Sequence, residues 1–452
     1  MPIDPSLPFS TGKTATVLVA VLLLAGLDVL CRVRNRNWHL AFAAVLGTLL
    51  SLGFITVTRE LFSQRFADSP HLMAFGVVLL LIGWRFLFGG WQTQTKAAVL
   101  GTALFWIMLQ MLVRESAADR TAHLIAIAVA LVPAGVWCAL FLSYHRERVS
   151  AVLLLFFAGI LSTAPILFYD ALVRHKVELQ FFFFRVVPES FNASAHSFVN
   201  GQLQGVSEVQ TTLVALFLSF LCVGFIEEGS KYWVLSRAGG RIFESIDDVM
   251  QLAIVTAIGF AFAENVSQSG YFVNFIREYL LKPERDWGGF LGNVTGRAIL
   301  TNMVHIVSTG IMGYFLGLAI FAGPRLREAE ELGRRYRVLE YLHDLLGFEK
   351  KSIFRIEMVL TGFAAAVLLH AISNFLVTLP DVLPGNPRTI GDLVGSGDGS
   401  PLHIISIILV PSLLYVVGGF WLLTWLFERK ENMKRRGHLV PTDTYVVVEE
   451  IA

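Results

Sequence analysis

Long apolar stretches recur along the whole chain, and they constrain its fold more than any other feature. Hydrophobic residues make up 55% of the 452 residues and charged residues only 16%, and the mean hydropathy is +0.62. Because a helix needs about 20 apolar residues to cross the hydrocarbon core of a bilayer, the sequence predicts an all-α, polytopic transmembrane bundle with about eleven crossings. These crossings are expected at residues 14–30, 39–57, 71–90, 96–113, 121–143, 149–171, 211–236, 249–272, 297–321, 355–379 and 402–427.

Clusters of basic residues between these stretches predict the orientation of the chain. Arginine and lysine in short loops favour the cytoplasmic side, and the clusters alternate well with the predicted crossings. The amino terminus is therefore expected outside and the carboxyl terminus inside. The clusters are Arg32 to Arg36, Arg146 with Arg148, Arg237 with Arg241, Arg325 to Arg355, and Arg429 to Arg436.

Charge and cysteine content exclude several classes of function. The formal net charge of +1 leaves no long basic surface, so nucleic acid is not expected as a partner. The three cysteines, Cys31, Cys138 and Cys222, lie within or at the edge of apolar stretches and show no CxxC spacing, so the sequence supports neither a disulfide framework nor a zinc knuckle. The lipid bilayer is the partner that composition does predict.

The ionisable residues lie at different depths in the predicted membrane helices of the two halves of the chain. In the first six crossings they fall mostly near the predicted helix ends, where they can reach the headgroups, whereas the later helices carry them well inside the apolar stretch. We therefore expect an N-terminal transmembrane scaffold, an outer loop or interfacial segment, a functional helix core, and an outer loop followed by the last crossing and a basic cytoplasmic tail. These parts cover residues 1–171, 172–210, 211–379 and 380–452.

Two long connections carry predictions of their own. Residues 322–354 mix acidic and basic side chains at helical spacing, which is typical of a solvated cytoplasmic helix. Residues 380–401 are rich in Pro, Gly and Asp, which predicts a mobile outer loop.

The stretch 211–236 contains two adjacent carboxylates and a lysine. Glu227 and Lys231 are four residues apart and so share one face of a helix, where the ammonium can keep a carboxylate charged. Glu228 points about 100° away. Charges inside a membrane are costly and are usually functional. The structural alternative is that one of the glutamates only ends the helix and pairs with Lys231.

Three later helices add further polar residues at similar depth. Glu264 follows Phe260 by one helical turn among small residues, which permit close helix packing. His305 precedes Thr309 by four residues, and His370 precedes Asn374 by four. A lone buried histidine is usually a packing residue, but two histidines with two acidic helices predict a shared site, which antiparallel helices can bring together in the outer half of the membrane.

Two mechanisms fit these residue types, and the sequence leaves both open. In the first, Glu227 or Glu228 takes a proton from water that attacks a peptide carbonyl, an imidazole assists, and Asn374 stabilises the oxyanion. In the second, Glu264, His305 and His370 bind a divalent, zinc-like ion while Glu227 or Glu228 serves as base. The chain has no HExxH helix, so this metal prediction depends on ligand type alone.

Together these motifs resemble the PrsW family of bacterial intramembrane proteases, which is similar in its helix core to the CAAX-endopeptidase and bacteriocin-processing group. The resemblance covers residues 211–379 and rests on four elements in order: Glu-Glu-x-x-Lys from Glu227, Phe-x-x-x-Glu-Asn from Phe260, His305 before Thr309-Gly310, and His370-x-x-x-Asn374. It implies a catalytic set of Glu227, Glu228, Glu264, His305, His370 and Asn374.

The resemblance also implies a setting. Family members include a protease that cuts a membrane anti-sigma factor on its outer side, so an anti-sigma factor is implied as a substrate and the bacterial cell membrane as the location. This chain departs from the CAAX group at Glu264, where that group has a histidine. The water-activating role of that histidine is therefore not assigned to Glu264.

An integral-membrane endopeptidase, acting in or near the bilayer on a membrane protein or peptide, is the leading hypothesis. A proton- or cation-coupled transporter and a catalytically inactive scaffold that binds a partner helix are the alternatives. A transporter would typically show two repeated halves with broken helices, and the sequence shows no such repeat.

Overall fold

The computed structural model describes most of the predicted crossings. It covers residues 39–63, 70–87, 89–143, 147–168, 179–181, 184–186, 208–240, 242–267, 271–331, 333, 336–383, 385–397 and 399–435. The predicted crossing at 14–30 lies outside these described residues. The other ten predicted crossings coincide with helices, and eight described helices are long and apolar enough to span a membrane. The fold is therefore a polytopic helical bundle, as predicted.

The chain divides into two compact units, at Ser116 and Ala117. The first unit contains three described helices, α2 (His39–Ser63), α3 (Pro70–Leu87) and α4 (Thr93–Arg114). The second contains the longer helices α5 (Ala117–Leu142), α6 (Val149–Leu161), α9 (Glu208–Gly239), α10 (Ile246–Ser267), α12 (Trp287–Ile320), α15 (Lys350–Val382) and α18 (Gly419–Arg435). Its short elements are β1 (Leu179–Phe181), β2 (Phe184–Val186), α11 (Phe272–Phe275), η1 (Ile276–Leu280), α13 (Ala322–Glu331), α14 (Arg337–Leu346), α16 (Ile390–Val394), η2 (Pro401–Ile404), α17 (Leu409–Leu413) and η3 (Leu414–Gly418).

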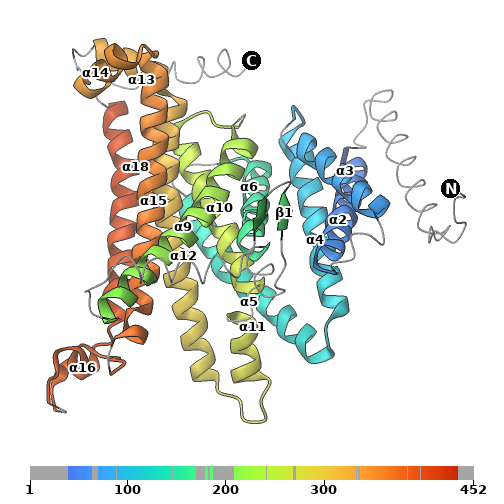
Figure 1. Ribbon diagram of the computed structural model, residues 1–452, viewed down its shortest axis with the longest axis vertical. Helices are drawn as coiled ribbons and strands as arrows, with labels where there is room; N and C mark the ends of the chain where they lie inside the picture. The colour runs from blue at the N-terminus through green and yellow to red at the C-terminus, as the bar shows by residue number, and fades with distance from the viewer. Residues whose placement is uncertain are drawn as a thin grey trace, which may run out of the picture. The chain divides into compact units, whose positions relative to one another are not determined.

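Helices α10 and α12 form the centre of the second unit (Figure 1). In each of them, 89% of the most apolar window is buried, against 28–39% in the other candidate spans. Helix α10 packs on α5, α6, α9 and α12, and α12 packs in turn on α15. Because these two helices are buried on nearly all sides, a polar side chain on either of them is held inside the protein, where leaving it without a partner is costly.

Two glycines allow the close contact between α6 and α10. Gly159 of α6 and Gly259 of α10 lie so close to the facing backbone, at Thr256 and Phe156 respectively, that a Cβ atom on either would overlap a carbonyl oxygen. Helix backbones approach this closely only where small residues face each other. The small residues before Glu264 therefore do permit close packing, as the sequence predicts.

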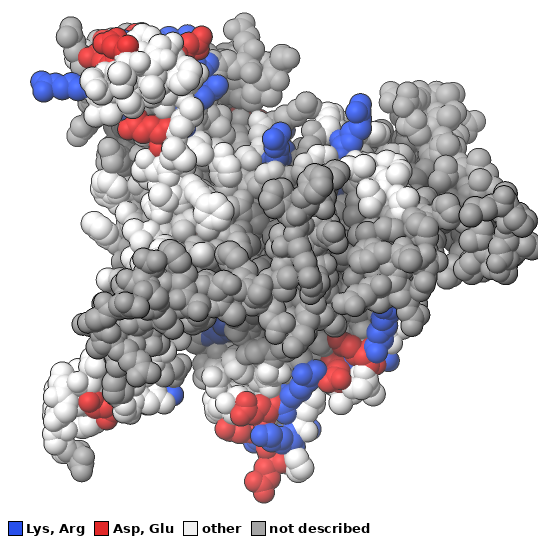
Figure 2. All heavy atoms as spheres, in the orientation of Figure 1, with Lys and Arg blue, Asp and Glu red and all other residues white. Residues whose placement is uncertain are grey.

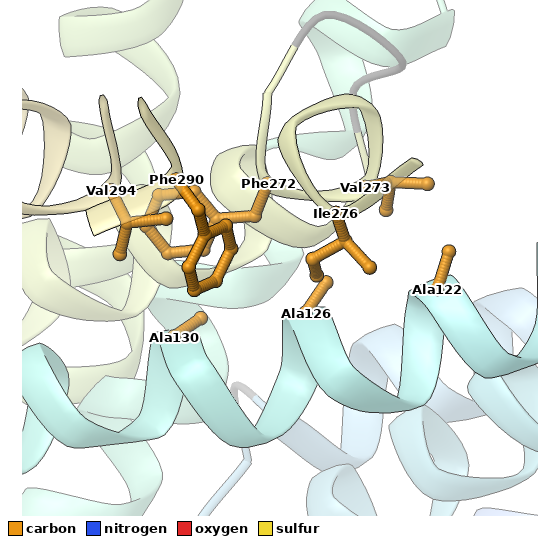
Figure 3. Packing of buried hydrophobic residues seen from close by; sticks show 8 residues of the cluster. All are labelled: Ala122, Ala126, Ala130, Phe272, Val273, Ile276, Phe290 and Val294. Atoms are coloured by element: carbon orange, nitrogen blue, oxygen red, sulfur yellow. The ribbon is translucent and has the colours of Figure 1, made fainter. Parts of the chain in front are cut away.

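A hairpin formed by α11, η1 and the first part of α12 packs on α5. Figure 3 shows Phe272, Ile276 and Phe290 lying over alanines of α5 that recur every fourth residue. Arg277 of η1 also forms an ion pair with Asp119 of α5, with 2.6 Å between Nη2 and Oδ1. We call residues 271–290 the hairpin end of the second unit.

At the other end of α12, the predicted solvated helix is two helices, α13 and α14. Leu339 of α14 packs on Ile353 and Phe354, while Val338 and Leu345 remain exposed. Figure 2 shows acidic and basic side chains gathered over this end and again at the hairpin end. Charged residues thus mark both ends of the apolar helices.

The segment predicted as a mobile outer loop has regular structure in its described part. Thr389 caps α16 through a capping box with Asp392, and the amide of Ile390 donates to the carbonyl of Ile405 over 2.8 Å. His403 lies beside this cap, 3.2 Å from Asp392. The helix cap and this backbone hydrogen bond therefore give regular structure to a segment whose composition is typical of a loop.

Candidate active site

The two adjacent glutamates of α9 have different surroundings, because successive helical residues face different neighbours. Glu228 and Lys231 are both fully buried, and 2.7 Å separates Glu228 Oε1 from Lys231 Nζ. The ion pair therefore spans three residues, whereas the sequence predicted that Lys231 pairs with Glu227 four residues away. Both spacings bring side chains together on a helix, and the packing of α12 and α15 selects the shorter one.

Glu228 contacts side chains from three helices, α9, α12 and α15. Besides Lys231, its Oε2 atom accepts a hydrogen bond of 2.9 Å from Thr309 of α12. Its Oε1 atom lies 2.8 Å from Nδ1 of His370 on α15. A buried carboxylate with three donors is well compensated for its loss of water. Glu228 is thus occupied as an acceptor and orients the groups around it.

Glu227 is buried but not saturated. Its Oε2 atom has no hydrogen-bond partner among the described residues, and it lies 3.5 Å from Nε2 of His370. Buried polar atoms without partners are rare and commonly mark a site where a ligand or water belongs. This oxygen is the open position of the cluster.

His305 lies between a donor and an acceptor. Its Nδ1 atom is 2.9 Å from Lys231 Nζ, and its Nε2 atom is 2.9 Å from Glu264 Oε2. Because an ammonium can only donate, Nδ1 accepts from Lys231, and Nε2 carries the hydrogen that is donated to Glu264. The ring also contacts Phe260 and His370, each at 5.0 Å between centroids.

Glu264 connects His305 to an arginine outside the predicted site. Arg297 of α12 lies 3.2 Å from Glu264, measured from Nη2 to Oε1, and donates from Nε to Asn265 Oδ1 over 2.6 Å. The expected helix began at residue 297, which made Arg297 a helix-end residue. The helix actually begins ten residues earlier, at Trp287. An arginine inside a long helix was the signal that could have found it.

Asn374, the sixth predicted catalytic residue, is half-buried on α15. Among the described residues, it makes no hydrogen bond to the other five. The structure thus brings Glu227, Glu228, Glu264, His305 and His370 into one connected cluster, and Asn374 remains a prediction.

Three of these residues can offer ligand atoms to one metal ion. One atom from each of Glu227, His305 and His370 lies within 4.8 Å of the other two. The ligand set predicted from the sequence contains Glu264 in place of Glu227. Two imidazoles and a carboxylate form a donor set typical of catalytic zinc, and the orphaned Glu227 oxygen fits an ion. The residues present therefore suit a divalent metal. Both ring nitrogens of His305 already have partners, so His305 can bind the metal only if it gives up its contact with Lys231 or with Glu264.

Comparison with protein families matches residues 147–396 to the PrsW family intramembrane metalloprotease. These residues are more than half of the chain. They begin at the connection into α6 and contain all the residues of the cluster. No match was found among curated proteins or among solved structures. The chain, an integral multi-pass membrane protein with a buried Glu-His-His cluster, belongs to the PrsW family of intramembrane metalloproteases.

Proposed function

We propose that this intramembrane protease activates water at the cluster formed by Glu227, His305 and His370, with Glu264 as the proton acceptor. The observation that carries the proposal is the buried Oε2 atom of Glu227, which lies 3.5 Å from His370 Nε2 and accepts no hydrogen bond from the part of the chain that the structure describes. An unsatisfied acceptor of this kind is costly unless something binds it. A ligand or metal ion bound at this oxygen during catalysis would offset this cost.

Glu227, His305 and His370 would hold a divalent metal, which when bound supplies a Lewis acid and lowers the pKa of a water molecule. Glu228 does not bind there, because its oxygens already accept from Lys231, Thr309 and His370. Instead it accepts from His370 Nδ1 and so directs the Nε2 lone pair toward Glu227. A carboxylate behind a ligating histidine commonly fixes its tautomer in this way.

Glu264 is a second carboxylate that borders this set without belonging to it. Its Oε2 atom lies 2.9 Å from His305, so a proton accepted there stays next to the reacting groups. The same carboxyl group can later return the proton to the leaving amine. Peptide hydrolysis needs these two transfers, and one positioned carboxylate can perform both.

The substrate is a membrane protein, and its finer identity is part of the proposal. By the family resemblance we propose a membrane-anchored anti-sigma factor as the substrate and the bacterial cell membrane as the location. A transporter is less well supported, because Glu227, Glu228, His305 and His370 form one compact cluster instead of a file of groups across the bundle.

The test uses the purified full-length chain in proteoliposomes and a panel of quenched fluorogenic single-span peptides. E227Q is expected to lower cleavage by about 100-fold or more, since removal of an essential acid, base or ligand has effects of this size. E244Q is the matched control, because Glu244 forms an exposed ion pair with Arg148 away from the cluster. Cleavage by E227Q at the rate of E244Q would refute the proposal.

A further inference from the structure

Arg297 is a mostly buried arginine beside the proposed active site. Its side chain is 17% exposed, and it precedes His305 by eight residues, which corresponds to about 12 Å along α12. Burying a guanidinium is costly unless it is paired and hydrogen-bonded. The groups that pair with the guanidinium of Arg297 therefore indicate its role.

Those contacts all come from the end of α10 and the segment after it. The Nε atom donates to Asn265 over 2.6 Å, Nη2 lies 3.2 Å from Glu264 Oε1, and the guanidinium carbon is 3.0 Å from the centre of the Tyr271 ring. Asn265 is itself buried. One planar group is thus held along its edge and across its face.

The arrangement divides the two oxygens of Glu264 between different partners. Oε1 faces Arg297, and Oε2 faces His305. The ion pair attracts Oε1 toward Arg297, and this favours the orientation of the carboxylate in which Oε2 faces His305. Among the described residues, Glu264 therefore links Arg297 to His305.

We propose that Arg297 is a positioning residue that fixes Glu264 by Oε1 and so presents Oε2 to His305 and to the attacking water. Asn265 has the supporting role of holding Arg297 at Nε. This inference rests on the proposed function, because it assigns Glu264 to the proton transfer. It also predicts that lysine cannot substitute, since an ammonium lacks the planar fork that meets Asn265, Glu264 and Tyr271 together.

The main test compares R297K with R277K by cleavage of the fluorogenic peptides in proteoliposomes. R297K is expected to lower kcat by about 10- to 100-fold, the usual effect of losing a group that orients a reacting one, with little change in KM. Arg277 is the matched control, because it is also paired with a carboxylate, Asp119, but lies in the hairpin. R277K is expected to keep the wild-type kcat.

Two further measurements separate positioning from folding. N265A is expected to lower kcat as well, and R297K/N265A to be no slower than R297K, because both changes break the same linkage. Added guanidinium ion is expected to restore part of the kcat of R297A but none of that of R297K, whose side chain fills the space. Thermal unfolding in detergent establishes that each variant is folded, and N265A carries the test if the Arg297 variants are not.

The outcomes are distinguishable. A wild-type kcat in R297K or in N265A would overturn the positioning role and leave the proposed function intact. A raised KM at constant kcat would also overturn it, because Arg297 would then bind substrate. If the folded wild-type protein cleaves no peptide of the panel, the proposed function fails, and this inference fails with it.

Discussion

The Nε2 atom of His370 and the Oε2 atom of Glu227 face each other across 3.5 Å, and Glu228 holds the opposite nitrogen of the same ring at 2.8 Å. Two neighbouring carboxylates of α9 therefore contact one imidazole in different ways. Glu228 is saturated with donors, and Glu227 is not. This difference leads to separate predictions for the two glutamates.

E227Q is expected to abolish cleavage, but after treatment with a chelator it should melt in detergent at the same temperature as chelator-treated wild type, because Glu227 Oε2 has no hydrogen-bond partner among the described residues. E228Q is expected to lower both the cleavage rate and the melting temperature, because it leaves the buried Lys231 ammonium without its charged partner. Breaking a buried ion pair on one side costs about 3–5 kcal/mol. Cleavage assays and thermal unfolding of the two variants measure the contrast. Equal melting temperatures would show that Glu228 does not stabilise the cluster.

Lys231 is expected to be a structural partner of Glu228 and His305, with no part in the chemistry. K231M removes the donor to both groups, so the melting temperature should fall. E228Q/K231M, in which both buried charges are gone, should be more stable than K231M. A double variant less stable than either single variant would contradict this pairing.

Metal content tests the proposed ligand set directly. The purified protein is expected to contain about one zinc-like ion per chain, to lose activity on treatment with a strong chelator and to regain it with zinc. E227Q and H370A should lower the metal content measured by mass spectrometry, and E244Q should not. Full activity of the metal-free protein would exclude a role for the ion.

The sequence alone predicted the helical bundle and singled out five polar residues that the structure brings together, but it did not predict how they pair. Hydropathy marks the crossings because every backbone group in lipid must be satisfied within a helix. The partner of Lys231 was not predictable, because Glu227 and Glu228 both lie within reach on a helix and the packing of α12 and α15 decides between them. Arg297 was missed because α12 extends beyond its most apolar stretch, to Trp287, where the hairpin and α5 cover it.

The close contact between α6 and α10 should be intolerant of side chains. G259A is expected to lower the melting temperature, because the added Cβ would overlap the carbonyl oxygen of Phe156 and push the two helices apart. G135A is the matched control, since a Cβ there meets no atom within 4 Å, and helix propensity favours alanine. Equal stability of G259A and G135A would show that the helices can separate at little cost.

The connection before α6 should make stability depend on pH. Burial and the neighbouring carboxylates Asp248 and Glu244 raise the pKa of Glu147 to about 7 from its usual value of 4.5. The folded protein then holds a proton that the unfolded chain releases, so this contribution is complete below pH 4.5 and is lost as the pH rises through 7. The melting temperature of wild type is therefore expected to fall between these two values more than that of E147Q. E284Q, in an exposed turn of the hairpin end, should follow wild type, and parallel curves for wild type and E147Q would refute the shift.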